Sequence, residues 1–388
     1  MLPIPVLTPQ QAADWDRCAE SAGISPATLM ETAGRAAASL LAERFAAGVR
    51  QGVLVAAGPG NNGGDGWVIA RTLHRLGAPV WVAALPAAGG TLAAGVAERA
   101  RSEGVREVSV DGPWPAAGVL VDAILGTGAS GAPRGAALGL MERLADLTLP
   151  LMAVDGPTGL DLSDGVQHGG LQAHLTVTFG GYRRGHLLAR DDVGDVVVVD
   201  IGFPPPDPSW PVLYTDHDAT AALPRFRADM HKGDRGRVVV VGGSAGLTGA
   251  GRLAARAAFA SGAGLVHLVS PQSSVDIFAT AEPDLQTAVQ AFDAPLSPAA
   301  RAVLERADAV IVGPGLGLHP ERHRLVGEVL ALSKTAVVDA DALSAFAGNA
   351  GALTEAVRGR PVVLTPHLGE FRGLVPDLAA GAAVDPWQ

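Results

Sequence analysis

Two glycine-rich segments, each placed between a run of β-forming residues and a helix-forming stretch, constrain this chain most. The first, GPGNNGGDG at 58–66, follows Val53-Leu54-Val55, and the second, GGSAGLTGA at 242–250, follows the four valines 238–241. A glycine-rich turn from a strand into a helix brings backbone N–H groups and a helix N-terminus to an anionic ligand. Two such turns predict two α/β domains, each with a nucleotide-sized site.

Composition narrows the possible partners. A chain of 388 residues that is 48% hydrophobic and 18% charged is long enough for two globular domains. Its net charge of −10 and its lack of a basic run argue against nucleic acid or an anionic membrane as a partner. The single cysteine, Cys18, cannot form an internal disulfide or a cysteine metal site. The N-terminus lacks a signal-peptide pattern and no run reaches eighteen apolar residues, so we expect a cytoplasmic protein.

Helix and strand signals alternate along the chain. Thr8, Pro9 and Gln11 form a capping-box pattern that begins a helix ending near residue 22, and Ser25-Pro26 begins a second helix. Several valine-rich runs are continuous rather than alternating, which is typical of buried parallel strands. The predicted strands are 52–57, 79–84, 107–110, 119–124, 151–154, 175–179, 195–200, 237–242, 264–269, 308–312, 335–339 and 361–364.

The proline-rich segment 203–211 cannot continue a sheet or a helix. The alternation of strands and helices restarts after it, with an Ala-rich helix over 250–262. We therefore predict two domains, 1–213 and 214–388.

Polar clusters follow three of the predicted strands of the first domain. They are Asn61–Asp65, then Asp122 with Gly126-Thr127-Gly128, and Asp155 with Thr158 and Asp161. Because ligands of open parallel sheets bind at the carboxyl ends of the strands, we expect the three clusters to converge. The oxygens of Asn62, Asp122 and Thr158 suit a hard cation. Asp155 is a candidate acid, base or hydroxyl-binding group.

Each cluster also has an ordinary structural reading. Asn-Gly and Gly-Asp are common in turns, and an aspartate at a helix start is a common N-cap, so a single aspartate decides nothing. The block GNNGGDG as a whole indicates a functional site rather than an ordinary turn. The usual dinucleotide-binding fingerprint, G-x-G-x-x-G, fits this segment poorly.

Three segments of the first half, GPGNNGGDGWVIARTLHRLG, VDAILGTGASG and VDGPTGLD, resemble the epimerase domain of NAD(P)H-hydrate repair enzymes. The resemblance covers about residues 1–203. It implies a Rossmann-like three-layer αβα domain that interconverts the R and S epimers of hydrated NADH and NADPH with bound potassium. The chain has Asp-Gly-Pro-Thr-Gly at 155–159 where the family usually has Asp-Ile-Pro-Ser-Gly, and threonine keeps the hydroxyl.

The resemblance assigns roles by position. Potassium would be bound by Asn62, Asp122 and Thr158, and Asp155 would be catalytic and face the ligand. The remaining contacts to the hydrated nucleotide would come from Asn61, Asn62, Gly63, Gly64 and Asp65, and from the phosphate-binding run Gly126, Thr127, Gly128, Ala129, Ser130, Gly131 and Ala132.

The second half resembles the ribokinase-like dehydratase domain of the same system. The matching segments are HKGDRG at 231–236, the turn 242–250, VGPGLG at 312–317, DADAL at 339–343 and TPHLGE at 365–370. The family reaction removes water from the S-hydrate with ADP or ATP and Mg²⁺. By resemblance Ala250, Gly315 and His367 would contact the hydrated nucleotide. His367 read alone is a loop histidine before a helix.

The family pattern continues with a Gly-Ser-Gly-Asp motif that binds the adenine nucleotide and supplies a catalytic aspartate, and this sequence contains none. We therefore expect a ribokinase-like domain lacking its C-terminal part, an active epimerase half and an inactive dehydratase half. We also expect a homo-oligomer. The alternatives are a non-catalytic nicotinamide-nucleotide-binding protein and a small-molecule kinase of ribokinase-like fold.

Overall fold

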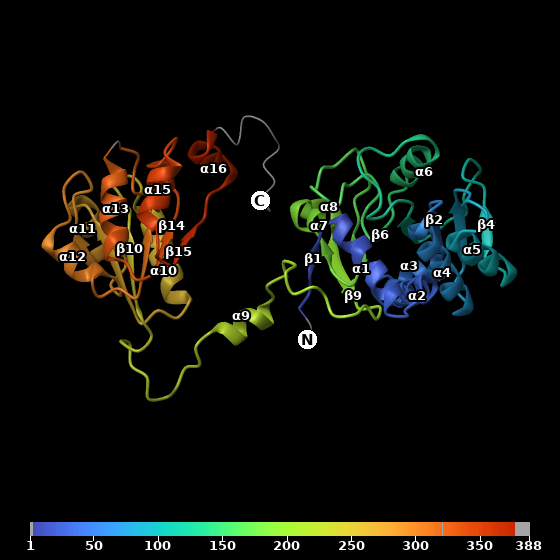
Figure 1. Cartoon of the computed structure of the whole chain (residues 1–388), viewed down its shortest axis with the longest axis horizontal. Helices are drawn as coiled ribbons and strands as arrows, with labels where there is room; N and C mark the ends of the chain where they lie inside the picture. Colours follow the sequence, from blue (N-terminus) through green and yellow to red (C-terminus); the bar gives the residue numbers. More distant parts are fainter. Residues whose placement is uncertain (1–2, 320, 377–388) are drawn as a thin grey trace. The chain divides into compact units, whose positions relative to one another are not determined.

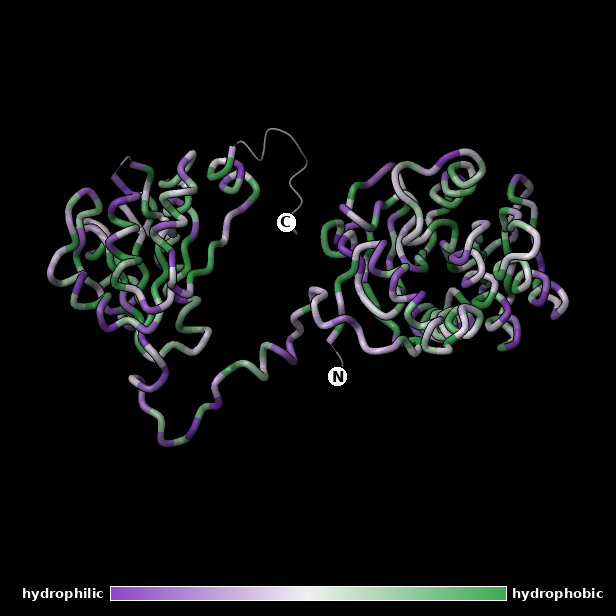
Figure 2. The backbone as a smooth tube through the Cα atoms, viewed as in Figure 1, coloured by the Kyte–Doolittle hydropathy of each residue, from purple (hydrophilic) through white to green (hydrophobic). Residues whose placement is uncertain are grey.

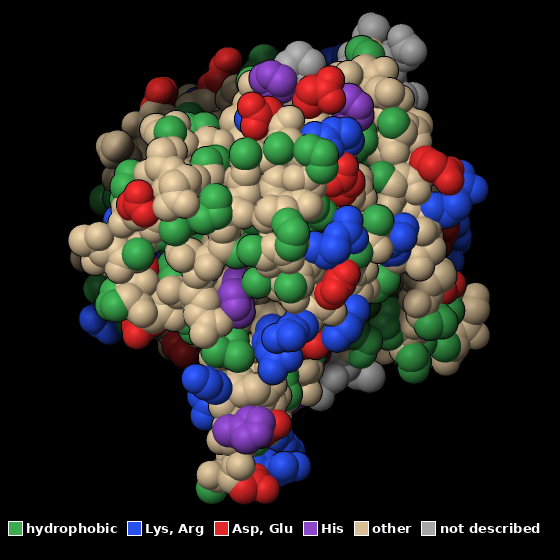
Figure 3. All heavy atoms as spheres, turned by 90° about the vertical axis from the view of Figure 1, so that its left-hand side faces the viewer, with side chains coloured by type: hydrophobic (Ala, Val, Ile, Leu, Met, Phe, Trp, Pro, Cys, Tyr) green, Lys and Arg blue, Asp and Glu red, His purple; other side chains and the backbone are tan. Residues whose placement is uncertain are grey.

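A computed structural model of the chain, which describes residues 3–319 and 321–376, divides into two compact units, 1–222 and 223–388 (Figure 1). Within those described residues, none of the helices is both long and apolar enough to cross a bilayer. On the face drawn in Figure 3, acidic and basic side chains are interspersed among hydrophobic ones. The predicted boundary after residue 213 stays a prediction, while the compact units divide after Ala222.

The first unit is built on a seven-stranded sheet of order β4-β3-β2-β5-β6-β7-β9, and every neighbouring pair in it is parallel. This is the Rossmann-like arrangement that the sequence predicts. Its strands are β2 (Val53–Ala57), β3 (Val80–Ala84), β4 (Arg106–Val108), β5 (Val119–Ala123), β6 (Leu151–Val154), β7 (Leu175–Phe179) and β9 (Asp195–Val199), close to the predicted ranges.

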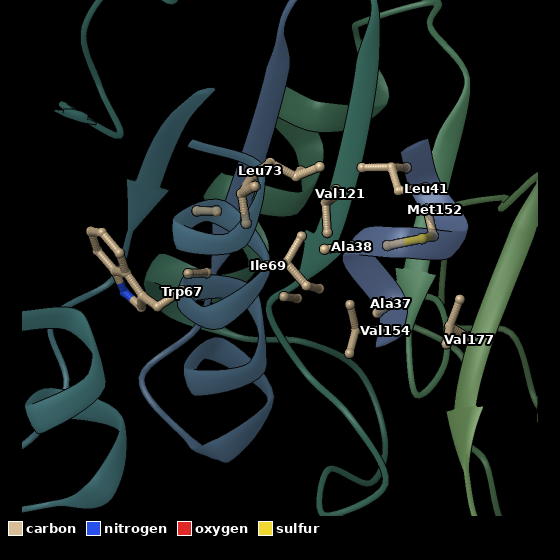
Figure 4. Packing of buried hydrophobic residues seen from close by; sticks show 14 of the residues in the cluster. Ala37, Ala38, Leu41, Trp67, Ile69, Leu73, Val121, Met152, Val154 and Val177 are labelled. Carbon is tan, nitrogen blue, oxygen red and sulfur yellow. The ribbon is translucent and has the colours of Figure 1, made fainter. Parts of the chain in front are cut away.

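Helices cover both faces of this sheet, which explains the continuous apolar strands. In β2, Val53 and Val55 face one buried cluster and Leu54 faces another. The first cluster contains side chains of α2 (Pro26–Arg44), α4 (Asn61–Arg75) and α5 (Leu92–Ser102), and the second those of α6 (Gly135–Ala145). Figure 4 shows Ile69 of α4 beside Val121. Each buried aliphatic side chain contributes roughly 1.5–3 kcal/mol, so both faces stabilise the sheet.

The N-terminal segment and the proline-rich segment pack together within the first unit. Thr8 begins α1 (Pro9–Ser21) with the predicted capping box. The Trp15 ring of α1 stacks on Phe203 with ring centroids 4.5 Å apart and meets the edge of Trp210. The backbone N–H of Val6 donates to the carbonyl of Pro211 at 2.8 Å. These contacts fix α1 and the N-terminal segment against the proline-rich segment.

Four short elements of the first unit were not predicted. The strands β1 (Val6–Leu7) and β8 (Tyr182–Arg183) form a two-stranded parallel sheet, and two single-turn helices, α7 (Arg184–Leu188) and α8 (Arg190–Val193), follow β8. The remaining helices are α3 (Ala46–Gln51), between α2 and the sheet, and α9 (Asp216–Ala222), which has no buried residue.

The second unit is a six-stranded sheet of order β12-β11-β10-β13-β14-β15, again with every neighbouring pair parallel. Figure 2 shows its strands as mostly hydrophobic stretches of the tube. The strands are β10 (Arg237–Val241), β11 (Leu265–Ser270), β12 (Gln286–Val289), β13 (Ala309–Val312), β14 (Ala336–Val338) and β15 (Val362–Leu364). The sequence did not predict β12, because this edge strand reads Gln-Thr-Ala-Val and is half polar.

Helices again cover both faces of the second sheet. Val239 and Val241 of β10 belong to one buried cluster and Val240 to another. The helices are α10 (Thr248–Ala260), α11 (Gln272–Ala281), α12 (Pro298–Leu304), α13 (Arg322–Leu332), α14 (Asp341–Ser344), α15 (Ala350–Val357) and α16 (Leu368–Leu374). The observed α10 agrees with the predicted Ala-rich helix over 250–262.

Candidate functional site

A cavity of about 610 Å³ lies in the first unit at the carboxyl ends of its central strands. Side chains of α1 and α2 line it, together with the loops that follow β2, β5 and β6. The three polar clusters that the sequence singles out therefore meet at one place. The predicted site residues that line the cavity are Asn61, Asn62, Asp65, Gly126, Thr127, Gly128, Ala129 and Asp155.

The predicted glycines Gly63 and Gly64 do not line the cavity. Both are buried in the first turn of α4. A Cβ on Gly63 would collide with the carbonyl of Gly58, and a Cβ on Gly64 would lie 2.7 Å from the Met30 side chain. These two glycines let α4 pack closely on the turn before it and on α2. The same packing turns Asn61, Asn62 and Asp65 to the cavity wall.

The loop after β5 passes between α4 and β6. An ideal Cβ on Gly126 would lie 3.0 Å from Asn62 Cγ and 3.0 Å from Asp155 Oδ2. Gly126 therefore separates these two polar side chains at close range. Ser130, Gly131 and Ala132 do not line the cavity, and Gly131 instead donates its N–H to the Asp161 carboxylate at 3.1 Å.

Asp155 sits at the end of β6 with a backbone φ of 68°. This left-handed conformation costs a residue other than glycine about 1–3 kcal/mol, and such strain is concentrated at functional sites. Its Oδ2 accepts the backbone N–H of Thr127 at 2.7 Å and also the Thr127 hydroxyl. Its Oδ1 lies 3.4 Å from the Arg183 guanidinium.

Two residues that sequence reasoning missed hold Asp155. Arg183 donates to the Thr127 hydroxyl at 3.0 Å and to the Gly181 carbonyl at 2.8 Å. His186 Nδ1 accepts the Arg183 backbone N–H at 3.0 Å, so its Nε2 carries the proton and donates to the Asp155 carbonyl at 2.7 Å. Burial and the Arg183 charge lower the pKa of His186 to about 4, so this histidine is neutral. Both residues follow β7, and their place at the end of a parallel strand was the available signal.

The ionisation of Asp155 is set by its partners. Burial raises the pKa of this carboxyl, but the Arg183 charge and the hydrogen bonds from Thr127 outweigh it, and the pKa lies below its ordinary value. Asp155 is therefore an anion at neutral pH. An anionic carboxylate in the cavity wall can accept a hydrogen bond or a proton from a ligand hydroxyl.

Two further carboxyl groups in the cavity behave differently. Burial raises the pKa of Asp65 well above its ordinary value, and the charges of Asp155 and Asp16 raise it further. Burial also raises the pKa of Asp16 on α1, against the opposing charge of Arg183. Asp16 is another cavity residue that the sequence did not identify, because it belongs to no recognised site motif and α1 reaches the cavity only through tertiary packing.

The predicted cation ligands Asp122 and Thr158 are hydrogen-bonded to each other. Asp122 is fully buried and accepts the Thr158 backbone N–H at 2.7 Å, the Thr158 hydroxyl at 2.8 Å and the Ile124 N–H at 3.1 Å. Burial raises the pKa of Asp122 to about 6, and only hydrogen bonds oppose it. The third ligand, Asn62, lies beside Gly126, and its Nδ2 has no acceptor in the described part of the chain.

The oxygen donors of these residues are chemically suited to a hard cation. Asp122 is a buried carboxylate with no cationic side chain bonded to it in residues 3–319 and 321–376, and its neighbours offer amide and hydroxyl oxygens. Within the same ranges no three His, Cys, Asp or Glu side chains are grouped as a metal site. Oxygen donors with a single carboxylate favour a hard cation over zinc or copper.

In the second unit, the loops that follow β10, β13 and β14 are joined by hydrogen bonds. The Ser244 N–H donates to the Gly315 carbonyl at 2.7 Å, and the Gly317 N–H donates to Asp341 Oδ2 at 2.8 Å. Gly315 has φ 64°, and its Cβ would lie 3.2 Å from that of Ala250. The structure thus brings Ala250 and Gly315 together.

His367 plays a local structural part. Its Nδ1 accepts the N–H of Gly369 at 3.0 Å and that of Glu370 at 3.3 Å, so it caps α16. A cavity of about 340 Å³ in this unit is lined by Leu318, His319, Arg322, Asp341, Ser344 and Ala345, and none of the three predicted contact residues is among them.

Solved structures with similar folds include a yeast protein called ynu0, at 25% identity and a TM-score of 0.46, covering 52% of this chain and 94% of that one. They also include an ADP/ATP-dependent NAD(P)H-hydrate dehydratase from Bacillus subtilis, at 25% identity and a TM-score of 0.35, covering 42% and 55%.

Sequence comparison gives the family. Residues 26–185 match the model described as YjeF-related protein N-terminus, and residues 238–384 match that of NAD(P)H-hydrate dehydratase. A bifunctional NAD(P)H-hydrate repair enzyme from Pyrobaculum aerophilum is 36% identical over 380 residues, covering 92% of this chain and 73% of that protein. The one from Archaeoglobus fulgidus is 34% identical over 366 residues, with the same coverage. The chain therefore belongs to the family of bifunctional NAD(P)H-hydrate repair enzymes.

Proposed function

We propose that the first unit interconverts the two epimers of hydrated NADH and NADPH. The observation that carries this proposal is the meeting of three strand-end clusters at one cavity, with the strained anion Asp155 in its wall. The family membership supports the substrate class. In these hydrates, water has added to the reduced nicotinamide ring, and the hydroxyl-bearing carbon beside the ring nitrogen is the epimeric centre.

Asp155 is the proposed base. Its carboxylate is an anion that accepts a proton from the hydroxyl or water at the epimeric carbon, while Thr127 and Arg183 hold its two oxygens in place. The loop Gly126–Ala129 lines the same cavity, and the backbone N–H groups of Gly126 and Gly128 are suited to the phosphates, since those of Thr127 and Ala129 donate to Asp155 and to the Gly126 carbonyl.

Potassium is the proposed cation, with Asn62, Asp122 and Thr158 as its ligands. Bound there, it would supply a positive charge that compensates the buried Asp122 carboxylate beside the cavity. This role fits the raised pKa of Asp122, which burial imposes in the absence of a cationic partner.

The second unit is the proposed dehydratase half, with Ala250, Gly315 and His367 toward the hydrated nucleotide and ADP or ATP with Mg²⁺ as its cofactors. The chain spans 73% of the length of the curated relatives named above. The 388-residue sequence contains no Gly-Ser-Gly-Asp. We propose that the protein acts in the cytoplasm and as a homo-oligomer, with domains 1–213 and 214–388.

The test begins with a single epimer of hydrated NADPH in potassium buffer, observed by proton NMR. The folded protein should convert it to the epimer mixture much faster than buffer does. Asp155→Asn should lower the rate by about 10²- to 10⁴-fold, as expected for the loss of a general base. Asp164→Asn is the matched control, because exposed Asp164 only accepts the Val166 N–H at 2.9 Å and asparagine can do the same. Exchange at the buffer rate by folded wild-type protein would refute the proposal.

A further inference from the structure

Asp65 is a cavity carboxyl group that the proposed mechanism does not use. It lies in the second turn of α4, three residues after Asn62, so the two side chains share a face of the helix. Both line the cavity. Across residues 3–319 and 321–376, no hydrogen bond or ion pair to the Asp65 carboxyl is found. A carboxyl group that the protein leaves without hydrogen bonds at a cavity wall is available to a ligand.

The position of Asn62 relates Asp65 to Asp155. Asn62 Cγ and Asp155 Oδ2 both lie within 3.0 Å of the point where a Cβ on Gly126 would stand. The first turns of α4 therefore adjoin the catalytic carboxylate with only Gly126 between them. Asn62 Nδ2 is buried without an acceptor, so the same corner also holds a free amide donor.

The surroundings of the two carboxyl groups shift their pKa values in opposite directions. Arg183 and Thr127 keep Asp155 ionised, whereas burial raises the pKa of Asp65 and the charges of Asp155 and Asp16 raise it further. The titratable and charged groups that line the cavity are Asp16, Arg17 and Glu20 from α1, Asp65 from α4, Asp155 after β6, and Arg183 at the end of β8. Among these, only the two guanidiniums are cationic, and Arg17 is paired with Asp14.

Two carboxyl groups whose environments separate their protonation states are the usual sign of an acid and a base in one site. An epimerisation through loss and return of water needs both. One group must protonate the departing hydroxyl, and another must accept a proton from the returning water on the opposite face of the ring.

We propose that Asp65 is the catalytic acid of the epimerase and works with Asp155 as a two-carboxyl pair. Asp65 gives its proton to the hydroxyl oxygen, the carbon–oxygen bond breaks and water leaves. The lone pair of the ring nitrogen forms a double bond to that carbon. Solvent water then adds to the other face and loses a proton to Asp155. The net change is inversion at one carbon and transfer of one proton from Asp65 to Asp155. The reverse turnover, or exchange with solvent, restores the starting state.

This inference rests on the proposed epimerase function, and the experiment separates the two. The substrate is one pure epimer of hydrated NADPH, and the readouts are epimer exchange by NMR, its pH profile, and ¹⁸O incorporation from labelled water. Wild-type protein should exchange the epimers, incorporate solvent oxygen into the new epimer, and lose activity at high pH as Asp65 ionises. A wild-type protein that exchanges nothing refutes the epimerase function itself.

Asp65→Asn should lower kcat by about 10²- to 10⁴-fold with a much smaller change in KM, and should abolish the high-pH limb of the profile. Its thermal midpoint at pH 8 should equal or exceed that of wild type, because asparagine removes a buried ionisable group. Asp65→Glu keeps a proton donor, so it should retain measurable exchange with a shifted high-pH limb. This second variant keeps the test decisive if Asp65→Asn does not fold.

Asp16→Asn is the comparison variant, since it removes a carboxyl group with a raised pKa from the same cavity but from α1. It should keep the high-pH limb that Asp65→Asn loses. Three outcomes would overturn the inference while leaving the epimerase function intact. They are near-normal exchange in folded Asp65→Asn, loss of the limb in Asp16→Asn instead, and wild-type inversion with retention of the original oxygen.

Discussion

The Thr127 hydroxyl links the two charged groups of the cavity wall: it donates to the Asp155 carboxylate and accepts from the Arg183 guanidinium at 3.0 Å. The backbone N–H of the same residue donates to Asp155 at 2.7 Å. A loop that follows β5 thus orients a carboxylate at the end of β6 and an arginine at the end of β8. The three elements are far apart in sequence and act as one unit.

Replacement of Thr127 by valine tests this link. Thr127→Val removes a hydrogen bond to the charged form of Asp155, so the pKa of Asp155 should rise and the acidic limb of the rate profile should move to higher pH. A hydrogen bond to a charged group contributes about 1.5–3 kcal/mol, so kcat/KM should fall by roughly 10- to 100-fold. Thr72→Val is the control, because the Thr72 hydroxyl bonds only to the Val68 carbonyl within α4. An unmoved acidic limb would contradict this account.

The narrow gap at Gly126 gives a steric prediction. Gly126→Ala places a Cβ 3.0 Å from both Asn62 Cγ and Asp155 Oδ2, so the carboxylate or the amide must shift. Misplacement of a catalytic group by about 1 Å can cost roughly 10²-fold, so we expect kcat to fall by about 10- to 100-fold with the fold preserved. Gly139→Ala, in open space on α6, should leave kcat unchanged. Equal activity of the two variants would show that Gly126 does not position Asp155.

Because Asp122 is buried, we expect potassium to stabilise the protein to an extent that depends on pH. Burial raises the pKa of Asp122 in the folded state from 3.8 to about 6. The free energy of unfolding of the cation-free protein should therefore fall by about 3 kcal/mol as the pH rises through that range. Potassium at pH 7.5 should therefore raise the melting temperature, whereas tetramethylammonium at equal ionic strength should not. The difference should disappear at pH 4 and in Asp122→Asn.

Thallium, which substitutes for potassium, should locate the cation. After a soak of crystals, an anomalous peak should appear among Asn62, Asp122 and Thr158. A peak at another place, or tight zinc binding at this one, would argue against the proposed ligands.

The second unit should not dehydrate the S-hydrate in the 388-residue polypeptide. Phosphoryl transfer from ADP or ATP depends on groups positioned around the phosphates, and the sequence has no Gly-Ser-Gly-Asp to supply them. With ADP or ATP and Mg²⁺, the absorbance of NAD(P)H should not appear faster than in buffer. A bifunctional relative such as that of Archaeoglobus fulgidus serves as the positive control. Nucleotide-dependent dehydration by the purified chain would disprove the prediction.

The sequence by itself determined the two parallel sheets and the place of the site. Continuous valine runs such as Val53–Val55 and 238–241 indicate strands buried on both faces, and the turns 58–66 and 242–250 mark their carboxyl ends. These signals are local, since a continuous apolar run and a glycine-rich turn can each be recognised from a few neighbouring residues. The same logic identified Asn62, Asp122 and Asp155.

Only the tertiary structure decided which charges meet. The approach of α1 places Asp16 in the cavity, and the short pairing of β1 with β8 brings Arg183 and His186 to Asp155. It also assigned Gly63 and Gly64 to helix packing and His367 to a helix cap. Protonation states such as that of Asp65 depend on burial and on charges from distant segments, because electrostatic interactions act through space and sequence distance does not measure them.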